Sequence, residues 1–355
     1  MRALTRREFI ALGAGSAAIA TLGGIAYALR ASPPRPQPAI IPTTTAQPRG
    51  IGGSFVATSL PPPLWITANE DLYVVQYDQV PSVGLTSYTL WVYGLVRNEL
   101  RLSYDEVRAL PTETRMRTLE CIGNPAGGNL IGNIVWRGVP MRALLERAGV
   151  DARAKFVTIG GIDEYSTSVP IARALDDFAL LAFEMNGAPL PLGHGFPLRA
   201  ILPGVYGQKQ PKWVTSIGVL EQEELGPWES RGWSRAATIQ LNSAIKIPRP
   251  GTPAARGDLL IAGVALTDGI GIRAVEVSAD GGKTWRETIL TRGPNPYVWT
   301  TWGALFHGVA PGRYNVMVRA TDNQGNAQDQ LASGILANVF PNGTSAMHSI
   351  EIEVI

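Results

Sequence analysis

Cysteine is almost absent from this chain of 355 residues, which contains only Cys121. One cysteine excludes an internal disulfide, a CxxC redox pair, a zinc site of several thiolates and a CxxCH haem attachment. Histidine is also scarce, with His194, His307 and His348 as the three examples. Cys121 is therefore a buried apolar residue, a nucleophile or a ligand, and its surroundings have to decide between these interpretations.

The chain also lacks a run of basic residues in its main body. Its formal charge is +2, but the first fifty residues hold six Arg and no Lys against one acid, Glu8. The rest holds 25 basic and 28 acidic residues, a balance of −3. A nearly neutral body without Lys or Arg clusters argues against a nucleic-acid-binding protein.

The first thirty residues have the layout of an export signal. Arg6 and Arg7 precede an apolar run over residues 10–29, which contains the small-residue site Ala26-Tyr27-Ala28. The paired arginines resemble a twin-arginine signal, a route that carries folded proteins, often with a cofactor inserted. We expect residues 1–30 to be this signal or an anchor, because the run is about long enough to span a bilayer. The expected location is periplasmic or otherwise extracytoplasmic, with a possible membrane tether through residues 10–29.

Residues 31–63 contain nine prolines and a single aromatic residue, Phe55. Such a segment buries too little apolar surface to offset its ordering entropy. We therefore predict a Pro-rich tether.

Residues 64–236 alternate between strand and helix patterns. A helix is predicted over 103–110, where Ser103 and Glu106 have the spacing of a capping box. Another is predicted over 139–149, where apolar residues recur at helical spacing before Gly149. Strands are predicted over residues 87–94, 155–161, 179–190, 196–204 and 212–220. This mixture predicts an α+β domain rather than a doubly wound sheet.

Residues 237–355 show only strand patterns. Alternating apolar runs separated by Gly, Asp and Asn predict a β-sandwich of immunoglobulin type. A hairpin is predicted with its tip at Asp280-Gly281-Gly282. The predicted strands fall within residues 258–266, 272–290, 297–306, 312–322 and 348–355.

The segment around Cys121 is unsuited to a core. Residues 121–133 include three Asn and four Gly, which favours exposed backbone wrapped around a ligand. His194 is a possible base for a nucleophilic Cys121, which would make the protein a hydrolase or transferase. Arg199 and Lys212 favour another interpretation, because fixed cations near loop amides suit a phosphate. A thiolate beside an anion site points to a metal cofactor with a phosphate tail.

Several ordered motifs resemble one known family. Residues 119–150 ("LECIGNPAGGNLIGN…") resemble the molybdenum-ligand segment of the sulfite oxidase family of molybdopterin oxidoreductases. Residues 184–214 ("…GHGFPLRAILPGVYGQKQPKWV") are similar to its pterin-binding segment, and residues 275–285 with 312–328 to its C-terminal, often dimer-forming domain. The resemblance extends over residues 64–355 and implies a sulfite-oxidase-like domain followed by an immunoglobulin-like one.

The resemblance assigns roles to individual residues. It implies a molybdenum-molybdopterin cofactor whose metal is bound by the Cys121 thiolate, a soft ligand. His194 and Arg199 are implied to contact the pterin and its phosphate. Further cofactor contacts are implied for Asn69, Tyr73, Val74, Gln210, Pro211 and Lys212.

The departures from the family bear on the substrate. Val75 and Ala126 stand where sulfite oxidases carry arginines, and Trp233 stands where they carry an active-site tyrosine. Because a buried oxyanion needs paired donors, two lost cations argue against a dianion such as sulfite. We expect an apolar pocket with Trp233 in its wall, suited to oxygen-atom transfer on a neutral S-oxide or N-oxide. A sulfite dehydrogenase passing electrons to an external cytochrome is the alternative.

The expected partners follow from the same resemblance. Nothing resembling a haem domain precedes the tether, so we expect an external electron-transfer protein or a membrane redox partner. A homodimer is possible through residues 237–355. Two hypotheses without a cofactor remain open, an exported binding protein and a Cys121–His194 hydrolase, and metal analysis separates both from the enzyme.

Overall fold

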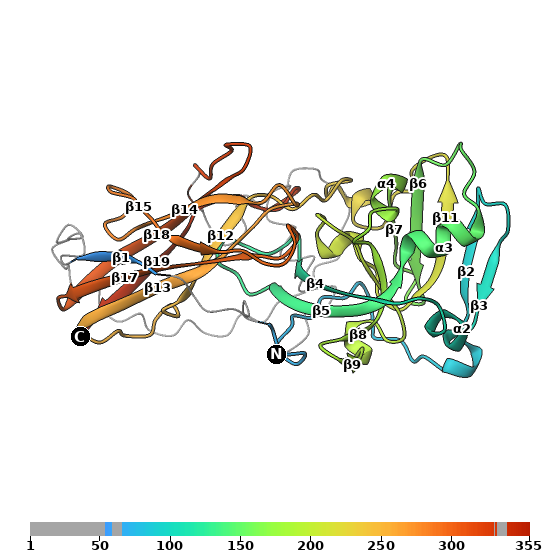
Figure 1. Cartoon of the computed structure of the whole chain (residues 1–355), viewed down its shortest axis with the longest axis horizontal. Coiled ribbons are helices and arrows are strands. Elements are labelled where there is room, and N and C mark those ends of the chain that lie inside the picture. The colour runs from blue at the N-terminus through green and yellow to red at the C-terminus, as the bar shows by residue number, and fades with distance from the viewer. Residues whose placement is uncertain (1–53, 59–65, 330, 332–338) are drawn as a thin grey trace, which may run out of the picture.

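The computed structural model describes residues 54–58, 66–329, 331 and 339–355. The molecule is elongated, with a β-sandwich at one end and a mixed region at the other (Figure 1). Strands β4 and β5 run lengthwise between the two ends. Among the described residues, no helix has the length and apolar character needed to cross a membrane. The predicted signal over residues 1–30 lies outside this description.

Two five-stranded sheets form the mixed region. One has the order β10-β8-β5-β4 with β9 paired to β8, and the other has the order β3-β2-β11-β6-β7. Only the β2–β11 pairing is parallel. The strands are β2 (Leu90–Gly94), β3 (Leu100–Leu102), β4 (Glu113–Glu120), β5 (Ile131–Pro140), β6 (Phe156–Gly161), β7 (Ser166–Pro170), β8 (Leu180–Met185), β9 (Ala188–Pro189), β10 (Arg199–Ile201) and β11 (Val214–Leu220).

The described helices of this region are short. They are α2 (Tyr104–Arg108), α3 (Met141–Ala148) and α4 (Ile171–Ala174), with 3₁₀ turns η1 (Leu85–Ser87), η2 (Leu192–His194), η3 (Gly207–Lys209) and η4 (Glu229–Arg231). The predicted capping box is present at α2, because Ser103 and Glu106 bond to each other's backbone N–H. Helix α3 buries the predicted apolar residues and ends at Gly149, whose φ of 71° suits glycine. The region is nevertheless mostly β, with less helix than the α+β prediction implies.

Two facing sheets form the β-sandwich. One has the order β1-β17-β13-β12 with β16 paired to β17, and the other has the order β15-β14-β18-β19. The strands are β1 (Phe55–Ala57), β12 (Asn242–Ile247), β13 (Gly257–Leu266), β14 (Ile272–Ser278), β15 (Arg286–Glu287), β16 (Ile289–Thr291), β17 (Thr300–Val309), β18 (Gly312–Asp322) and β19 (His348–Val354). The predicted hairpin joins β14 to β15, and the Asp280 carboxylate accepts hydrogen bonds from the backbone N–H groups of Lys283 and Thr284.

Strand β1 corrects the prediction of a tether over residues 31–63. Phe55, Val56 and Ala57 pair antiparallel with β17, so this piece of the predicted tether belongs to the sandwich. The Phe55 ring packs edge-on against Phe306 at 5.2 Å between centroids. A single aromatic residue and an alternating triplet are enough to add an edge strand to an existing sheet. The proline content of the neighbouring residues concealed this short strand.

One buried apolar cluster is shared by the two regions. It contains residues of the mixed region such as Leu72, Leu119 and Tyr206 together with Val264 and Trp299 of the sandwich. Each region also has a separate core of its own. The junction is therefore packed like a protein interior.

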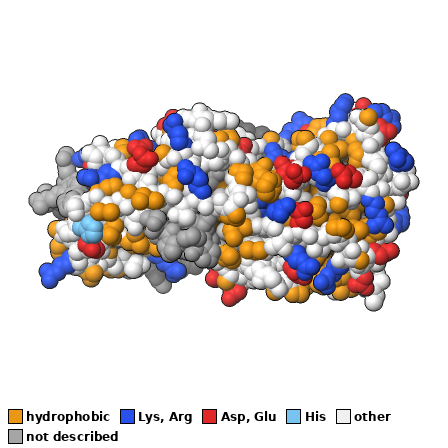
Figure 2. All heavy atoms as spheres, viewed as in Figure 1, with side chains coloured by type: hydrophobic (Ala, Val, Ile, Leu, Met, Phe, Trp, Pro, Cys, Tyr) orange, Lys and Arg blue, Asp and Glu red, His pale blue; other side chains and the backbone are white. Residues whose placement is uncertain are grey.

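Charged side chains of both signs are interspersed on the face of the molecule drawn in Figure 2. Neither Lys and Arg nor Asp and Glu form a continuous area on this face. This face therefore offers no basic surface for nucleic acid.

Candidate active site

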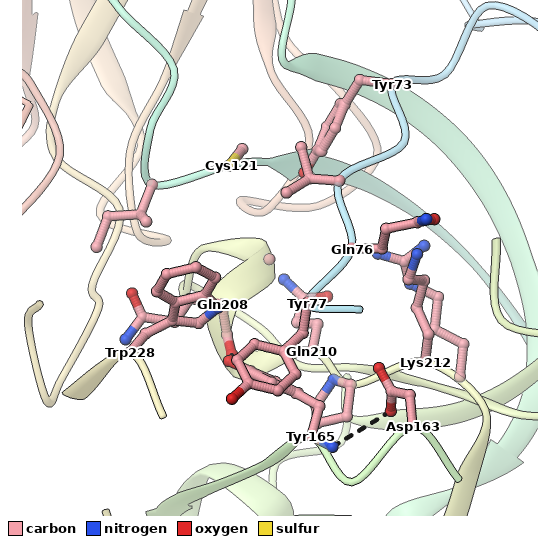
Figure 3. Close-up of a pocket in the computed structure, with 15 residues that line it drawn as sticks. Tyr73, Gln76, Tyr77, Cys121, Asp163, Tyr165, Gln208, Gln210, Lys212 and Trp228 are labelled. Atoms are coloured by element: carbon pink, nitrogen blue, oxygen red, sulfur yellow. Dashed lines mark hydrogen bonds between the residues drawn. The ribbon is translucent and has the colours of Figure 1, made fainter. Parts of the chain in front are cut away.

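A pocket beside Cys121 contains about 600 Å³ of empty space, a volume that includes open solvent at its mouth. Figure 3 shows Cys121 and Tyr73 on one side and Asp163 and Tyr165 on the other. The lining residues are Tyr73, Val75, Gln76, Tyr77, Cys121, Ile122, Asp163, Tyr165, Arg199, Gly207, Gln208, Gln210, Pro211, Lys212 and Trp228.

The segment that joins β4 to β5, residues 121–130, carries the thiol and is called the Cys121 loop below. It is closed by a hydrogen bond from Cys121 N to Leu130 O at 2.9 Å, and Cys121 O accepts from Asn124 N at 2.9 Å. Burial raises the pKa of the Cys121 thiol to about 12, and the neighbouring Glu120 adds to this. A bound metal cation reverses such a shift, because coordination deprotonates a thiol. A buried thiol with a raised pKa is a poor free nucleophile, which argues against the nucleophile interpretation.

Two cations lie within the pocket wall. Arg199 begins β10 and donates through Nη1 to His194 O at 3.2 Å. Lys212 donates through Nζ to Gly193 O at 3.0 Å. In the described part of the chain, neither side chain has an ion-pair partner. A Cβ on Gly195, whose φ is 109°, would lie 3.1–3.2 Å from side-chain atoms of both cationic residues, so the loop here has little room for a side chain.

Burial lowers the pKa values of both cations and of the neighbouring His194, and the charge of Arg199 adds to the shifts at Lys212 and His194. Burial, followed by the Arg199 charge, lowers the pKa of Lys212 to about 7. Burial lowers the pKa of Arg199 to about 10. Burial and then both cations lower the pKa of His194 to about 4. The Asp163 carboxylate in the same wall partly offsets the charge of Lys212. The remaining positive charge favours the binding of an anion.

The residues present fit a molybdopterin. Buried Tyr73 Oη, His194 Nδ1 and Arg199 Nε have no hydrogen-bond partner, which is costly unless a ligand supplies one. The described residues contain no cluster of three or more His, Cys, Asp or Glu side chains able to hold a metal ion. Arg199 and Lys212 suit the phosphate tail of such a cofactor.

The structure brings many of the predicted site residues to this pocket. Those in its wall are Tyr73, Cys121, Arg199, Gln210, Pro211 and Lys212. His194 is buried behind the cations, with Nε2 3.1 Å from Asn69 O. Asn69 Nδ2 donates to Met185 O at 3.2 Å, and Val74 lies close to Gly193, so these two residues support the wall without lining it.

Trp233 is a correction to the predicted pocket wall. Its ring packs edge-on against Phe340 at 5.1 Å between centroids, and Trp228 lines the pocket in its place. The chain turns through η4 between these residues, which directs the two indoles to different neighbours. Val75 lies in the wall, whereas Ala126 does not.

Several lining residues were missed by the sequence analysis. Gln76 and Tyr77 directly follow the segment that resembles the family's pterin contact, and Gln208 precedes the predicted Gln210, so their positions gave a signal. Asp163 and Tyr165 lie in the turn between β6 and β7. Tyr165 Oη donates to Gln208 O at 2.6 Å. Nothing in their local sequence indicated that this turn reaches the pocket.

Two protein-family models match successive parts of the chain. Residues 77–228 match the oxidoreductase molybdopterin binding domain, and residues 234–355 match the Mo-co oxidoreductase dimerisation domain. With the thiol and the cation pair in one pocket, these matches define a molybdopterin oxidoreductase. Molybdenum-molybdopterin is its cofactor, and it supplies two-electron redox chemistry when bound.

The relatives identify the family within this class. The chain is 31% identical over 319 residues to sulfite oxidase of Gallus gallus, covering 76% of this chain and 70% of that protein. It is 30% identical over 341 residues to mitochondrial sulfite oxidase of Rattus norvegicus, covering 82% of this chain. The match spans only 62% of the rat protein's length. The chain belongs to the sulfite oxidase family.

A solved structure shows the same fold. The sulfane dehydrogenase SoxCD from Paracoccus pantotrophus aligns with a TM-score of 0.72, over 93% of this chain and 93% of that one, at 24% identity. Family membership sets aside the two cofactor-free hypotheses, the binding protein and the Cys121–His194 hydrolase.

Proposed function

We propose that this enzyme transfers an oxygen atom to or from a neutral or weakly polar substrate, such as an S-oxide or N-oxide. Arg199 and Lys212 would hold the cofactor phosphate, and the Cys121 thiolate would bind molybdenum. The neutral lining residues would then receive the substrate and exclude water around it. This assignment extends the family chemistry to a substrate class that suits the pocket.

The observation that carries this proposal is the distribution of charge in the lining. Its charged members in the described chain are Arg199, Lys212 and Asp163. In Figure 3, Lys212 and Trp228 flank the pocket from opposite sides. Once both cations are engaged by a phosphate, the remaining wall offers a dianion no cation, and an unpaired buried charge costs several kcal/mol. The neutral side chains of the wall include the apolar or aromatic ones of Val75, Tyr77, Ile122, Tyr165 and Trp228 and the amides of Gln76, Gln208 and Gln210.

A steady-state survey in both directions tests the proposal. Fully metallated enzyme should reduce at least one neutral S-oxide or N-oxide with a reduced viologen dye, and should oxidise sulfite weakly or not at all. Efficient sulfite turnover that saturates at micromolar concentration would contradict the proposal.

A second candidate, sulfite oxidation, is supported by the relatives and by Arg231. The Arg231 guanidinium carbon lies 5.8 Å from the Tyr77 ring centroid and 5.7 Å from that of Trp228. Both aromatic residues line the pocket, so an exposed cation stands at its edge. Arg231→Gln separates the candidates, because it should abolish sulfite turnover only if this cation binds the substrate.

Partners and location complete the proposal. The dimerisation-domain match supports a homodimer, and electrons would pass to or from an external protein or a membrane redox partner. Residues 1–30 support export by the twin-arginine route. Replacing Arg6 and Arg7 with lysine should leave metallated protein in the cytoplasm. Unchanged delivery would point to a general signal or an anchor.

A further inference from the structure

A side chain of the sandwich contacts the residue next to the metal ligand. Asn242 in β12 donates through Nδ2 to Glu120 Oε2 at 3.0 Å. The other carboxylate oxygen, Oε1, accepts from Asn124 Nδ2 of the Cys121 loop at 2.8 Å. The carboxylate of Glu120 is buried, so its two oxygens connect the loop to the second domain through hydrogen bonds shielded from water.

Two more sandwich residues contact the Cys121 loop at its far side. Lys246 of β12 donates through Nζ to Gly128 O at 2.8 Å. His348 of β19 lies against Gly127, where a Cβ would fall 2.0 Å from the His348 Nε2 atom. The His348 Nδ1 atom accepts from Ile245 N at 3.0 Å, which fixes the imidazole on the sandwich. The loop is thus held at both ends by one domain.

These contacts differ in kind from the bonds inside the loop. Cys121 N to Leu130 O and Leu130 N to Asn124 Oδ1, both at 2.9 Å, close the loop on itself. Such internal bonds continue the pairing of β4 with β5 and set the loop's shape. Contacts from Asn242, Lys246 and His348 add a second set of constraints, which comes from the sandwich.

We infer that the C-terminal domain positions the molybdenum ligand, with Asn242 and Lys246 as positioning residues for the Cys121 thiolate. Partners one step removed from a metal ligand orient that ligand and tune the metal. A domain matched as a dimerisation module would then also complete the metal site. This inference rests on the proposed role of Cys121 as a molybdenum ligand and not on the identity of the substrate. If the enzyme proves to act on a substrate other than an S-oxide or N-oxide, the inference still stands.

The test compares three variants of the full-length, molybdenum-loaded enzyme. Asn242→Leu removes the amide donor at similar volume, and Lys246→Met removes the ammonium group while keeping most of the chain. Ser243→Ala is the matched control, because Ser243 Oγ donates to Gln328 Oε1 at 2.5 Å, within the sandwich and next to Asn242 in sequence. The readouts are the rate of molybdenum release during dilution, measured by metal mass spectrometry, and the thiolate-to-molybdenum absorption band.

We expect Asn242→Leu and Lys246→Met to release molybdenum at least about tenfold faster than the parent and to shift the absorption band. Ser243→Ala should match the parent in both measurements, even if its thermal midpoint falls. Parental release and spectra in both test variants would overturn the inference, as would an equal change in Ser243→Ala. Should Asn242→Leu fail to fold, Lys246→Met decides alone, since Lys246 is only partly buried.

Discussion

Arg199 and Lys212 donate to the carbonyl oxygens of two consecutive residues, His194 and Gly193, at 3.2 and 3.0 Å. The two cations are therefore oriented by the same short stretch of backbone and converge on one pocket. Preorganised cations lose little entropy on binding an anion. The fold itself therefore forms a pair of cations that suits a phosphate group.

Arg199→Ala should lower molybdenum occupancy after purification, because the cofactor phosphate loses a forked, charge-assisted partner. Metal mass spectrometry of the folded fraction measures this. Arg117→Ala is the control, since Arg117 is also buried but bonds to Asn295 Oδ1 and Phe178 O outside the pocket. Equal occupancy in both variants would contradict the role given to Arg199.

Cys121→Ser should abolish turnover and alter the molybdenum absorption or EPR signal. Serine offers a hard oxygen donor in place of a soft thiolate, although the side chains are similar in size. The spectrum should change even in molecules that retain the metal. Full activity with a parental spectrum would mean that Cys121 is not a ligand.

Val75→Arg should increase sulfite oxidation relative to the parent, because it restores a cation to the pocket wall. Ala126→Arg should have little effect, since Ala126 lies outside the wall although its position also resembles an arginine position in the family. The ratio of sulfite kcat/KM between the two variants measures the difference. Equal gains would show that the apolar wall does not determine substrate choice.

Lys209→Met should destabilise the fold by about 3–5 kcal/mol, because it leaves Glu229 buried and unpaired. Lys209 Nζ lies 2.5 Å from Glu229 Oε1 and also donates to Thr167 Oγ1 at 2.9 Å. The double variant Lys209→Met/Glu229→Leu should lose less stability, because no buried charge is left unpaired. The midpoints of denaturant unfolding measure the stability of the two variants. A double variant less stable than the single one would refute this explanation.

His348 should make the enzyme less stable as the pH falls from 6.5 to 4, in opposition to Glu120, whose pKa burial raises to about 7. Burial, followed by the Lys246 charge, lowers the pKa of His348 to about 4, against an ordinary value of 6.5. The unfolded chain therefore binds a proton first as the pH falls, which costs up to about 3 kcal/mol of stability near pH 4. His348→Gln should flatten this dependence, measured as unfolding midpoints from pH 7 to 4.5. His194 contributes similarly in both proteins, so parallel curves would contradict the assignment to His348.

The sequence predicts those parts of this protein that depend on local pattern. The capping box at Ser103 and the apolar face of α3 need only a few neighbouring residues, and both are present. Strand β1 was missed because its stability comes from pairing with β17, about 250 residues away, and not from its own residues.

The same distinction applies to the pocket. Cys121, Arg199 and Lys212 lie in motifs that can be recognised as those of a family from the sequence alone. Asp163 and Tyr165 reach the pocket through the β6–β7 turn, and Trp228 replaces Trp233 because of how η4 bends. Such placements are set by the packing of distant strands, which no local pattern records.

The apolar cluster shared by the mixed region and the sandwich affects how cooperatively the protein unfolds. Cutting the chain near residue 236 would expose Val264 and Trp299 on one side and Leu119 and Tyr206 on the other. Each fragment would keep its own separate core but would expose its half of the shared cluster, so the two regions should melt together in a single calorimetric transition. If sandwich domains were exchanged between related enzymes, the side chains of this shared cluster would have to fit each other as closely as those of a protein core.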